Sequence, residues 1–266
     1  MSGPQPARAL RPVALAAVAL LSLAPFALLL LASLADAWRF PALLPDRLGL
    51  DAWRGVVRGG ATARALGLSA LLAAGVGLIG TAIALPAGRV LVRLRGWRRH
   101  VAAAAAFLPV AAPPIALGPG LQLALLRAGV GGTATGVLVA HLVPATGYLA
   151  LFWLGVLDAH DRRAEDDART LGASPLQTWT RVVLPLLRLP IAESFALGFL
   201  VSWSQFALTL VVGGGAVRTL PLEVFAYVGA GQDRLAAAGA LLLGVPPVLA
   251  LAAVRIAAGR TQVAPP

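Results

Sequence analysis

The sequence predicts an all-α polytopic membrane protein with six transmembrane helices. Of its 266 residues, 59% are hydrophobic and only 12% are charged, which is too few to solvate the surface of a globular domain of this size. Six apolar stretches are also long enough to cross a bilayer, because about 20 residues with a rise of about 1.5 Å span roughly 30 Å of hydrocarbon. They run over about 13–34, 65–85, 101–126, 133–157, 189–212 and 235–256.

The arginines predict the orientation of these spans. All 22 basic residues are arginine, and basic residues are retained on the cytoplasmic side during insertion. Eight lie in three alternate connections, and 14 lie in the termini and the other two connections. We therefore expect both termini in the cytoplasm. The 14 are Arg8, Arg11, Arg89, Arg93, Arg95, Arg98, Arg99, Arg162, Arg163, Arg169, Arg181, Arg188, Arg255 and Arg260.

The composition also excludes several classes of function. A chain without lysine has no Gly-rich phosphate loop ending in Gly-Lys-Ser/Thr, so any ATP that drives this protein is bound by another chain. A chain without cysteine has no thiolate metal site, and its three histidines show no metal-ligand spacing. The net charge of +11 is spread between apolar runs, which indicates membrane lipid and no nucleic acid as the partner. We expect no cofactor, no metal, no catalytic residue and no enzymatic activity.

Outside the spans, two connections on the external side are long enough for short helices near 51–58 and 221–230. Inside the third predicted span, four prolines remove amide donors, so this helix should be kinked or partly unwound. They are Pro109, Pro113, Pro114 and Pro119.

The longest connection on the predicted cytoplasmic side reads as two short helices that meet at a sharp bend. In the first helix, Asp161, Glu165 and Asp166 come early and a basic residue comes late, which suits the helix dipole. Gly172 follows at a position where helices commonly end in a left-handed conformation.

The second short helix has its own start and stop signals. Ser174 can cap it, Pro175 suits the first helical position, and Gln177 completes a Ser-x-x-Gln capping box. An apolar stripe follows at i, i+3 and i+7, and Leu184-Pro185 ends the helix. The stripe consists of Leu176, Trp179 and Val183. The result is a rigid elbow.

The elbow resembles the EAA loop of bacterial ABC importer permeases. That loop has the pattern Glu-Ala-Ala, three residues, Gly, nine residues, Ile-x-Leu-Pro, and the spacing fits throughout. The chain departs from it with aspartate in place of the Glu and of the first Ala. The matching positions are Asp166, Asp167, Ala168, Gly172, Val182, Leu184 and Pro185. In the family this loop docks on a cytoplasmic ATPase subunit and couples ATP hydrolysis to movement of the membrane helices.

Other stretches resemble the same family, and the likeness covers about 62–255. Among them are "FLPVAAPPIALGPGLQLAL", "AHLVPATGYLALFWLGVLDA" and "LGFLVSWSQFALTLVVGGG". The last of these, followed by "TLPLEVFAYVGAGQDRLAAAGALLL", looks like the subgroup that includes permeases for polyamines, ferric iron, thiamine and phosphonates.

The resemblance implies one permease domain over 1–266 with the type I ABC importer fold. About 1–60 would hold the first span and an extracytoplasmic loop, and about 61–256 the core with its coupling loop at 158–188. The implied partners are a cytoplasmic ATPase dimer, a second permease subunit that is identical or homologous, and an extracytoplasmic solute-binding protein. The implied location is the bacterial inner membrane, and the implied mechanism is alternating access.

Polar residues in the fifth predicted span are candidates for the translocation path. Ser202, Gln205 and Thr209 recur at i, i+3 and i+7, so they lie on one helical face. The alternative is that they form interhelical hydrogen bonds, which is also the role we expect for His141 in the fourth span.

An ion-coupled secondary transporter is the alternative function. Such a protein should show repeated halves and discontinuous helices around charged groups at the midplane. The chain shows no visible repeat and little midplane charge, so the importer permease is the leading hypothesis.

Overall fold

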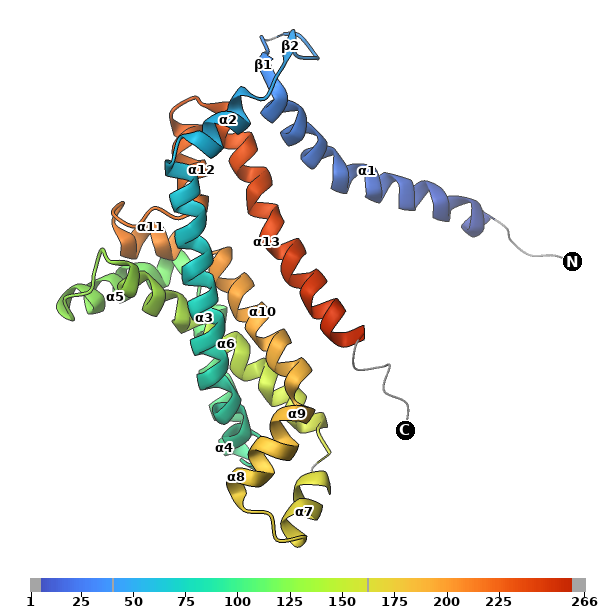
Figure 1. Ribbon diagram of the computed structural model, residues 1–266, viewed down its shortest axis with the longest axis vertical. Coiled ribbons are helices and arrows are strands. Elements are labelled where there is room, and N and C mark those ends of the chain that lie inside the picture. Colours follow the sequence, from blue (N-terminus) through green and yellow to red (C-terminus); the bar gives the residue numbers. More distant parts are fainter. Residues whose placement is uncertain (1–5, 40, 162, 260–266) are drawn as a thin grey trace, which may run out of the picture. The chain divides into compact units, whose positions relative to one another are not determined.

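The computed structural model describes residues 6–39, 41–161 and 163–259, so that Arg162 and Arg260 lie outside the described residues. The described chain is mostly helical (Figure 1). Its contacts divide it into two compact units, one formed by the chain up to Arg64 with Glu223–Val245, and the other by Ala65–Leu222 with the chain from Pro246 onward. Three helices run through both units, and the single-domain expectation stays a prediction.

The first unit begins with α1 (Pro6–Leu34) and α2 (Asp51–Arg58). Between them lies a short antiparallel hairpin, β1 (Ala35–Ala37) with β2 (Arg47–Leu48), which the sequence did not predict. The unit also holds the start of α3 (Ala61–Leu91), the end of α12 (Leu220–Gly229) and the first half of α13 (Asp233–Gly259). α2 and α12 confirm the two short helices expected near 51–58 and 221–230.

Long-range contacts hold this unit together. Ala52 and Val56 of α2 pack against Ala238 of α13. The indole nitrogen of Trp53 donates a hydrogen bond of 3.2 Å to the hydroxyl of Ser33.

The second unit is built around α6 (Ala134–Ala159), whose residues are largely buried. α4 (Trp97–Ala111) and α10 (Arg188–Trp203) pack against α6, while α11 (Ala207–Gly213) packs against both α6 and α5 (Pro114–Arg127) (Figure 1). The remaining elements of the connection between α6 and α10 are α7 (Arg163–Thr170), α8 (Pro175–Thr178), a π turn (Trp179–Val183) and α9 (Leu184–Leu186).

Small residues and one serine hold α3, α6 and α10 close together. A Cβ placed on Gly198 of α10 would lie 3.0 Å from the Cα of Gly77 on α3, so the two backbones nearly touch. The hydroxyl of Ser194 lies 2.9 Å from that of Thr81 and accepts a 2.9 Å hydrogen bond from Trp153 Nε1. Close backbone approach and interhelical hydrogen bonds are what hold helices together in lipid.

The structure confirms a multi-pass helical membrane protein. Among the described residues, α1, α3, α6 and α13 contain stretches long and apolar enough to cross a membrane, and two bent helix pairs raise the number to six if each counts as one span. One pair is α4 and α5, which meet at 97°. Their break at Ala112–Pro113 confirms the distortion predicted from the prolines. The other pair is Pro175–Leu186 with α10, bent by 69°.

The prediction of a continuous fifth helix is wrong. The apolar run over 189–212 is divided into α10 and α11, with Ser204, Gln205 and Phe206 between them. Gln205 is therefore not on a helix that continues from Ser202, and the i, i+3, i+7 face predicted for the three polar residues does not exist. No Gly or Pro marks this break, so the sequence held no local signal for it.

Candidate functional site

The elbow, residues 163–186, bends at Gly172. Gly172 has φ +85°, and its amide donates to the carbonyl of Arg169 while the amide of Ala173 donates to that of Ala168, both at 3.0 Å. These two bonds form a Schellman motif, which satisfies carbonyls left free at the end of α7. The left-handed end predicted from Gly172 is confirmed.

The capping box predicted for the second arm is also confirmed. Ser174 Oγ accepts a hydrogen bond of 3.3 Å from the amide of Gln177, and Gln177 Oε1 accepts one of 2.8 Å from the amide of Ser174. Pro175 occupies the first turn of α8. The chain therefore ends one helix and begins the next within four residues.

The π turn changes the predicted apolar stripe. The amide of Leu184 bonds to the carbonyl of Trp179, five residues back, and Pro185 has no amide to offer. Such a turn rotates the following residues relative to an α-helix. Leu176 therefore exposes 70% of its surface while Val183 is buried, although an α-helix would place both on one face. Val183 and Leu187 join the core formed by α3 and α6.

A residue far away in the sequence holds the two arms of the elbow together. Arg89, near the end of α3, donates from Nη2 to both carboxylate oxygens of Glu165 at 2.7 and 2.8 Å. Its guanidinium also lies 4.5 Å from the centre of the Trp179 ring. The Glu165 side chain is only 8% exposed and that of Arg89 22%. We call Arg89, Glu165 and Trp179 the Arg89 clamp.

Sequence reasoning missed the clamp. It treated Arg89 only as a topology signal, Glu165 as a dipole residue and Trp179 as part of the stripe. A single sequence carries no signal that connects Arg89 with a residue 76 positions later. His160 adds to the cluster, since its buried Nε2 has no hydrogen-bond partner among the described residues and lies 3.8 Å from Glu165 Oε1.

The outer side of the elbow presents apolar surface and a hollow. Leu171 exposes 88% of its surface at the bend, and Leu176 on the second arm is also exposed. Between the two arms lies a hollow of about 360 Å³. The residues that line it are Ala168, Leu171, Gly172, Ala173, Gln177, Arg181 and Val182.

Three of the seven motif positions thus share the hollow, namely Ala168, Gly172 and Val182. The other four lie elsewhere on the elbow. Asp166, Asp167 and Pro185 are exposed, and Leu184 is half-buried.

The second group of predicted residues is divided by the break between α10 and α11. Ser202 and Thr209 are buried, and each hydroxyl lies 2.9 Å from one ring nitrogen of His141 on α6. The Thr209 hydroxyl donates its proton to the carbonyl of Gln205, so the tautomer protonated at Nε2 satisfies both contacts: Nε2 donates to Thr209 and Nδ1 accepts from Ser202. These are the interhelical hydrogen bonds that the sequence offered as the alternative, and the role expected for His141 is confirmed. We call the three residues the His141 cluster.

Gln205 is placed differently. It is half-buried in the break beside the exposed Ser204, and its side-chain amide has no hydrogen bond to a described residue. Its backbone carbonyl accepts a 2.9 Å bond from the Thr209 hydroxyl. Non-helical backbone at membrane depth occurs where it is buried in protein or lines a water-filled cavity. The translocation-path role of Ser202, Gln205 and Thr209 stays a prediction.

A metal centre is not evident in the described part of the chain. Within it, no group of three or more His, Cys, Asp or Glu side chains could hold a metal ion.

Together, the apolar helices, the broken spans and the elbow define a class, the helical membrane component of a transport system. Residues 77–262 match the family described as "Binding-protein-dependent transport system inner membrane component". The chain belongs to this family of ABC importer permeases. The membership favours the importer over the ion-coupled secondary transporter.

Two curated relatives illustrate the likeness. The chain is 33% identical over 202 residues to the molybdenum transport system permease protein ModB of Mycobacterium tuberculosis, covering 70% of this chain and 76% of the relative. It is 30% identical over 201 residues to the putrescine transport system permease protein PotI of Escherichia coli, covering 72% of each.

A solved structure supports the fold. A chain of a bacterial ABC transporter involved in the import of the acidic polysaccharide alginate superposes with a TM-score of 0.72, covering 96% of this chain and 99% of that one. The identity is 16%, so this likeness concerns the fold alone.

Proposed function

We propose that this chain forms the translocation path of an ABC importer and couples a separate ATPase to solute uptake through the elbow. One observation carries the proposal. The elbow has an exposed outer side with an apolar bend at Leu171 and a hollow, and an inner side fixed to the membrane helices by the Arg89 clamp and Val183. A partner that moves the outer side would therefore move α3 and α6.

The acidic residues suit this role. Asp166, in the first turn of α7, and Asp167 beside it are exposed, so their carboxylates are free to meet basic groups of an ATPase. Glu165 faces inward and is occupied by Arg89. The contact to the ATPase should accordingly depend on Asp166 and Asp167, with Glu165 acting inside the permease.

The assembly follows from the same proposal. Two permease subunits, identical or homologous, would enclose the path and two ATPase subunits would hydrolyse ATP, while the permease itself supplies no catalytic residue and no cofactor. An extracytoplasmic binding protein would deliver the solute, in keeping with the family's description. Alternating access would move the solute across the inner membrane.

The arginine distribution supports an orientation with both termini and the elbow in the cytoplasm. Reporter fusions after Ala35, Gly96, Gly131, Gly172 and Gly215 should then alternate, beginning outside. An external signal at Gly172 would contradict the proposal, because an external elbow could not meet a cytoplasmic ATPase.

Within the fifth span, we place the path at the break. Gln205 and Ser204 are the polar side chains there that the His141 cluster does not use, whereas Ser202 and Thr209 support the break from inside. Unwound backbone within the membrane is where transporters commonly form their solute sites. Relatives named for molybdenum and for putrescine are similarly close to this chain, at 33% and 30% identity. A ligand screen of the associated binding protein would therefore identify the solute most directly.

The deciding experiment is Gly172→Val. A Cβ at Gly172 would meet no other atom of this chain, so within the permease the variant acts through the φ of +85°, at a local cost of about 1 to 2 kcal/mol. We expect normal membrane abundance and normal folding, together with loss of transport or ATP hydrolysis that no longer responds to the loaded binding protein. The measurement is transport and ATPase activity of the reconstituted importer.

The chain offers a matched control. Gly215 has φ +81° and open space around its Cβ position, but it lies in the loop before α12 and outside the elbow. Gly215→Val should impose the same backbone strain and leave coupling unchanged. If Gly172→Val transports as well as Gly215→Val at equal abundance, the elbow is a connector and the proposal is wrong.

A further inference from the structure

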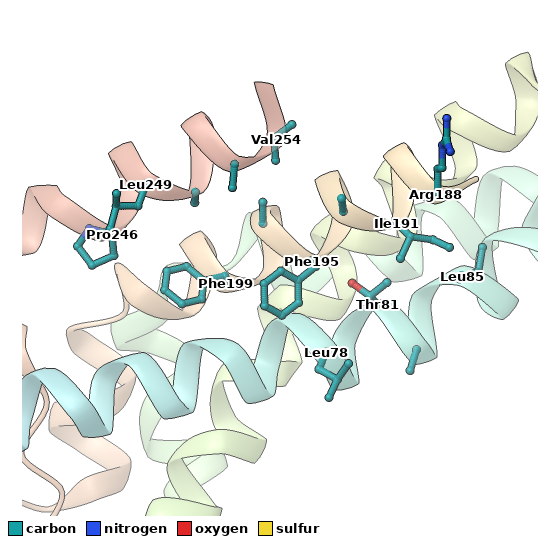
Figure 2. Close-up of a pocket in the computed structure, with 15 residues that line it drawn as sticks. Leu78, Thr81, Leu85, Arg188, Ile191, Phe195, Phe199, Pro246, Leu249 and Val254 are labelled. Carbon is teal, nitrogen blue, oxygen red and sulfur yellow. The ribbon is translucent and has the colours of Figure 1, made fainter. Parts of the chain in front are cut away.

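An apolar groove of about 810 Å³ runs along α10 between α3 and the second half of α13, all within one unit (Figure 2). Of its 15 lining residues, only Thr81 and Arg188 carry a polar side chain. Thr81 is already bonded to Ser194. The groove therefore offers a polar solute almost no hydrogen-bonding groups. In this it differs from the break, where Gln205 is available.

Arg188 lies at one end of this groove. In Figure 2 it is on the same side as Leu85 and Ile191, while Pro246 and Phe199 lie toward the other end. The distance along α10 from Arg188 to Phe199 is roughly 16 Å at about 1.5 Å per residue. Half of a hydrocarbon core of roughly 30 Å is about 15 Å. The groove thus has the length of one membrane leaflet, with its charge at the headgroup level.

The charge of Arg188 has no counterpart among the described residues. Arg188 is exposed and forms no ion pair with a described residue, including Glu193 on the same helix. It is also the first residue of α10, where the positive end of the helix dipole favours an anion. An occupant with an apolar body and an anionic head at one end would match both parts of the site.

A helix from a second copy of the chain fits this pattern less well. The most exposed apolar helix is α1, and residues 6–34 contain no acidic side chain that could pair with Arg188. We propose that the groove binds one anionic phospholipid from the leaflet on the elbow's side, with its phosphate at Arg188 and one acyl chain along Phe195, Phe199 and Leu249. The inference requires only that the chain spans a membrane and does not rest on coupling through the elbow.

Photolabelling of the assembled importer tests this directly. The probes are phosphatidylglycerol and phosphatidylcholine, each with the same photoreactive acyl chain, in vesicles of unlabelled phosphatidylcholine. We expect phosphatidylglycerol to label peptides of α10 and α13 that contain Phe195, Phe199 or Leu249. Its labelling should exceed that of phosphatidylcholine by about fivefold, the preference that one basic side chain near the surface provides.

Two variants and a control sharpen the result. Arg188→Gln should abolish the preference for phosphatidylglycerol, and Ala250→Trp should fill the groove and reduce labelling by both lipids. Arg98→Gln removes an exposed arginine on the same predicted side of the membrane but outside the groove, and should keep the wild-type pattern.

The inference fails if Arg188→Gln keeps the preference, or if the label falls outside the groove. It also fails if a cysteine at Phe199 crosslinks to a cysteine introduced in α1 of a second copy, because a helix would then occupy the groove. The natural chain has no cysteine, so the crosslink is unambiguous. Since labelling needs no ATP hydrolysis, the outcome is independent of whether the elbow couples.

Discussion

The elbow and the break between α10 and α11 are both sharp interruptions of helix, but they are encoded in opposite ways. The elbow bends through residues that are neighbours in the sequence, with a Schellman motif at Gly172 and a capping box at Ser174. The break contains neither Gly nor Pro, and its two sides are joined by His141, 61 and 68 residues away from its partners.

The surroundings explain this difference. The elbow's bend is exposed, where water can satisfy free backbone groups, so local caps are sufficient to define it. The break lies in the apolar part of the chain, where backbone groups freed from a helix need a partner within the protein or in a water-filled cavity. A bend at that depth has to be stabilised by another helix.

The Arg89 clamp gives the elbow a long-range contact as well, and removing it should have the largest effect. Arg89→Met would leave the Glu165 carboxylate buried without its partner, at a cost of about 3 kcal/mol to the attachment of the elbow. Amide hydrogen exchange over 163–186 should become much faster while α6 stays protected.

The control for the clamp is the double variant Arg89→Met with Glu165→Gln. No buried charge remains unpaired in it, so exchange in the elbow should return most of the way to the wild type. If the single variant exchanges at the wild-type rate, the clamp does not hold the elbow.

His141→Leu should have the next largest effect on stability, and this effect should be at the break between α10 and α11. The hydroxyls of Ser202 and Thr209 would each lose a partner, which should lower the free energy of unfolding by about 1 to 3 kcal/mol. Unfolding of the purified protein by sodium dodecyl sulfate should detect this, while exchange in the elbow remains unchanged.

His141→Gln is the matched variant, because an amide can keep one of the two bonds, and it should be less destabilising than His141→Leu. Equal stability of His141→Leu and the wild type would mean that the break persists without its ring, and the contrast between the two regions would then disappear.

Ser174→Ala should have the smallest effect, and a purely local one. Loss of the cap should cost about 1 kcal/mol, visible as faster exchange of the Gln177 amide with no change in the His141 cluster. Ser174→Gly should cost only a few tenths of a kcal/mol. Destabilisation that reaches α10 would show that the bend is less local than its hydrogen bonds indicate.

The contrast also explains what the sequence could predict. The helices at 51–58 and 221–230, the end at Gly172 and the cap at Ser174 depend on residues close together in the chain, and all four are confirmed. The distortion near Pro113 was predictable for the same reason, because each proline removes a backbone hydrogen-bond donor at its own position.

The Arg89 clamp and the break at Gln205 could not be predicted in this way. Arg89 and Glu165 meet only after α3 has packed beside the elbow. The apolar run over 189–212 has no Gly or Pro at the break, and Ser202, Gln205 and Thr209 suggest one helical face until the position of His141 is known. Tertiary contacts decided both features.

The π turn at Trp179–Val183 has a consequence for how permeases of this kind can diverge. An α-helix advances by about 100° per residue. In a continuous α-helix, Leu176 and Val183 would therefore have to point in the same direction. The π turn changes the angle between the directions in which Leu176 and Val183 point. Under the docking role proposed for the elbow, a change in this one turn would point the outward face toward a different ATPase, while Val183 and Leu187 keep their places against α6.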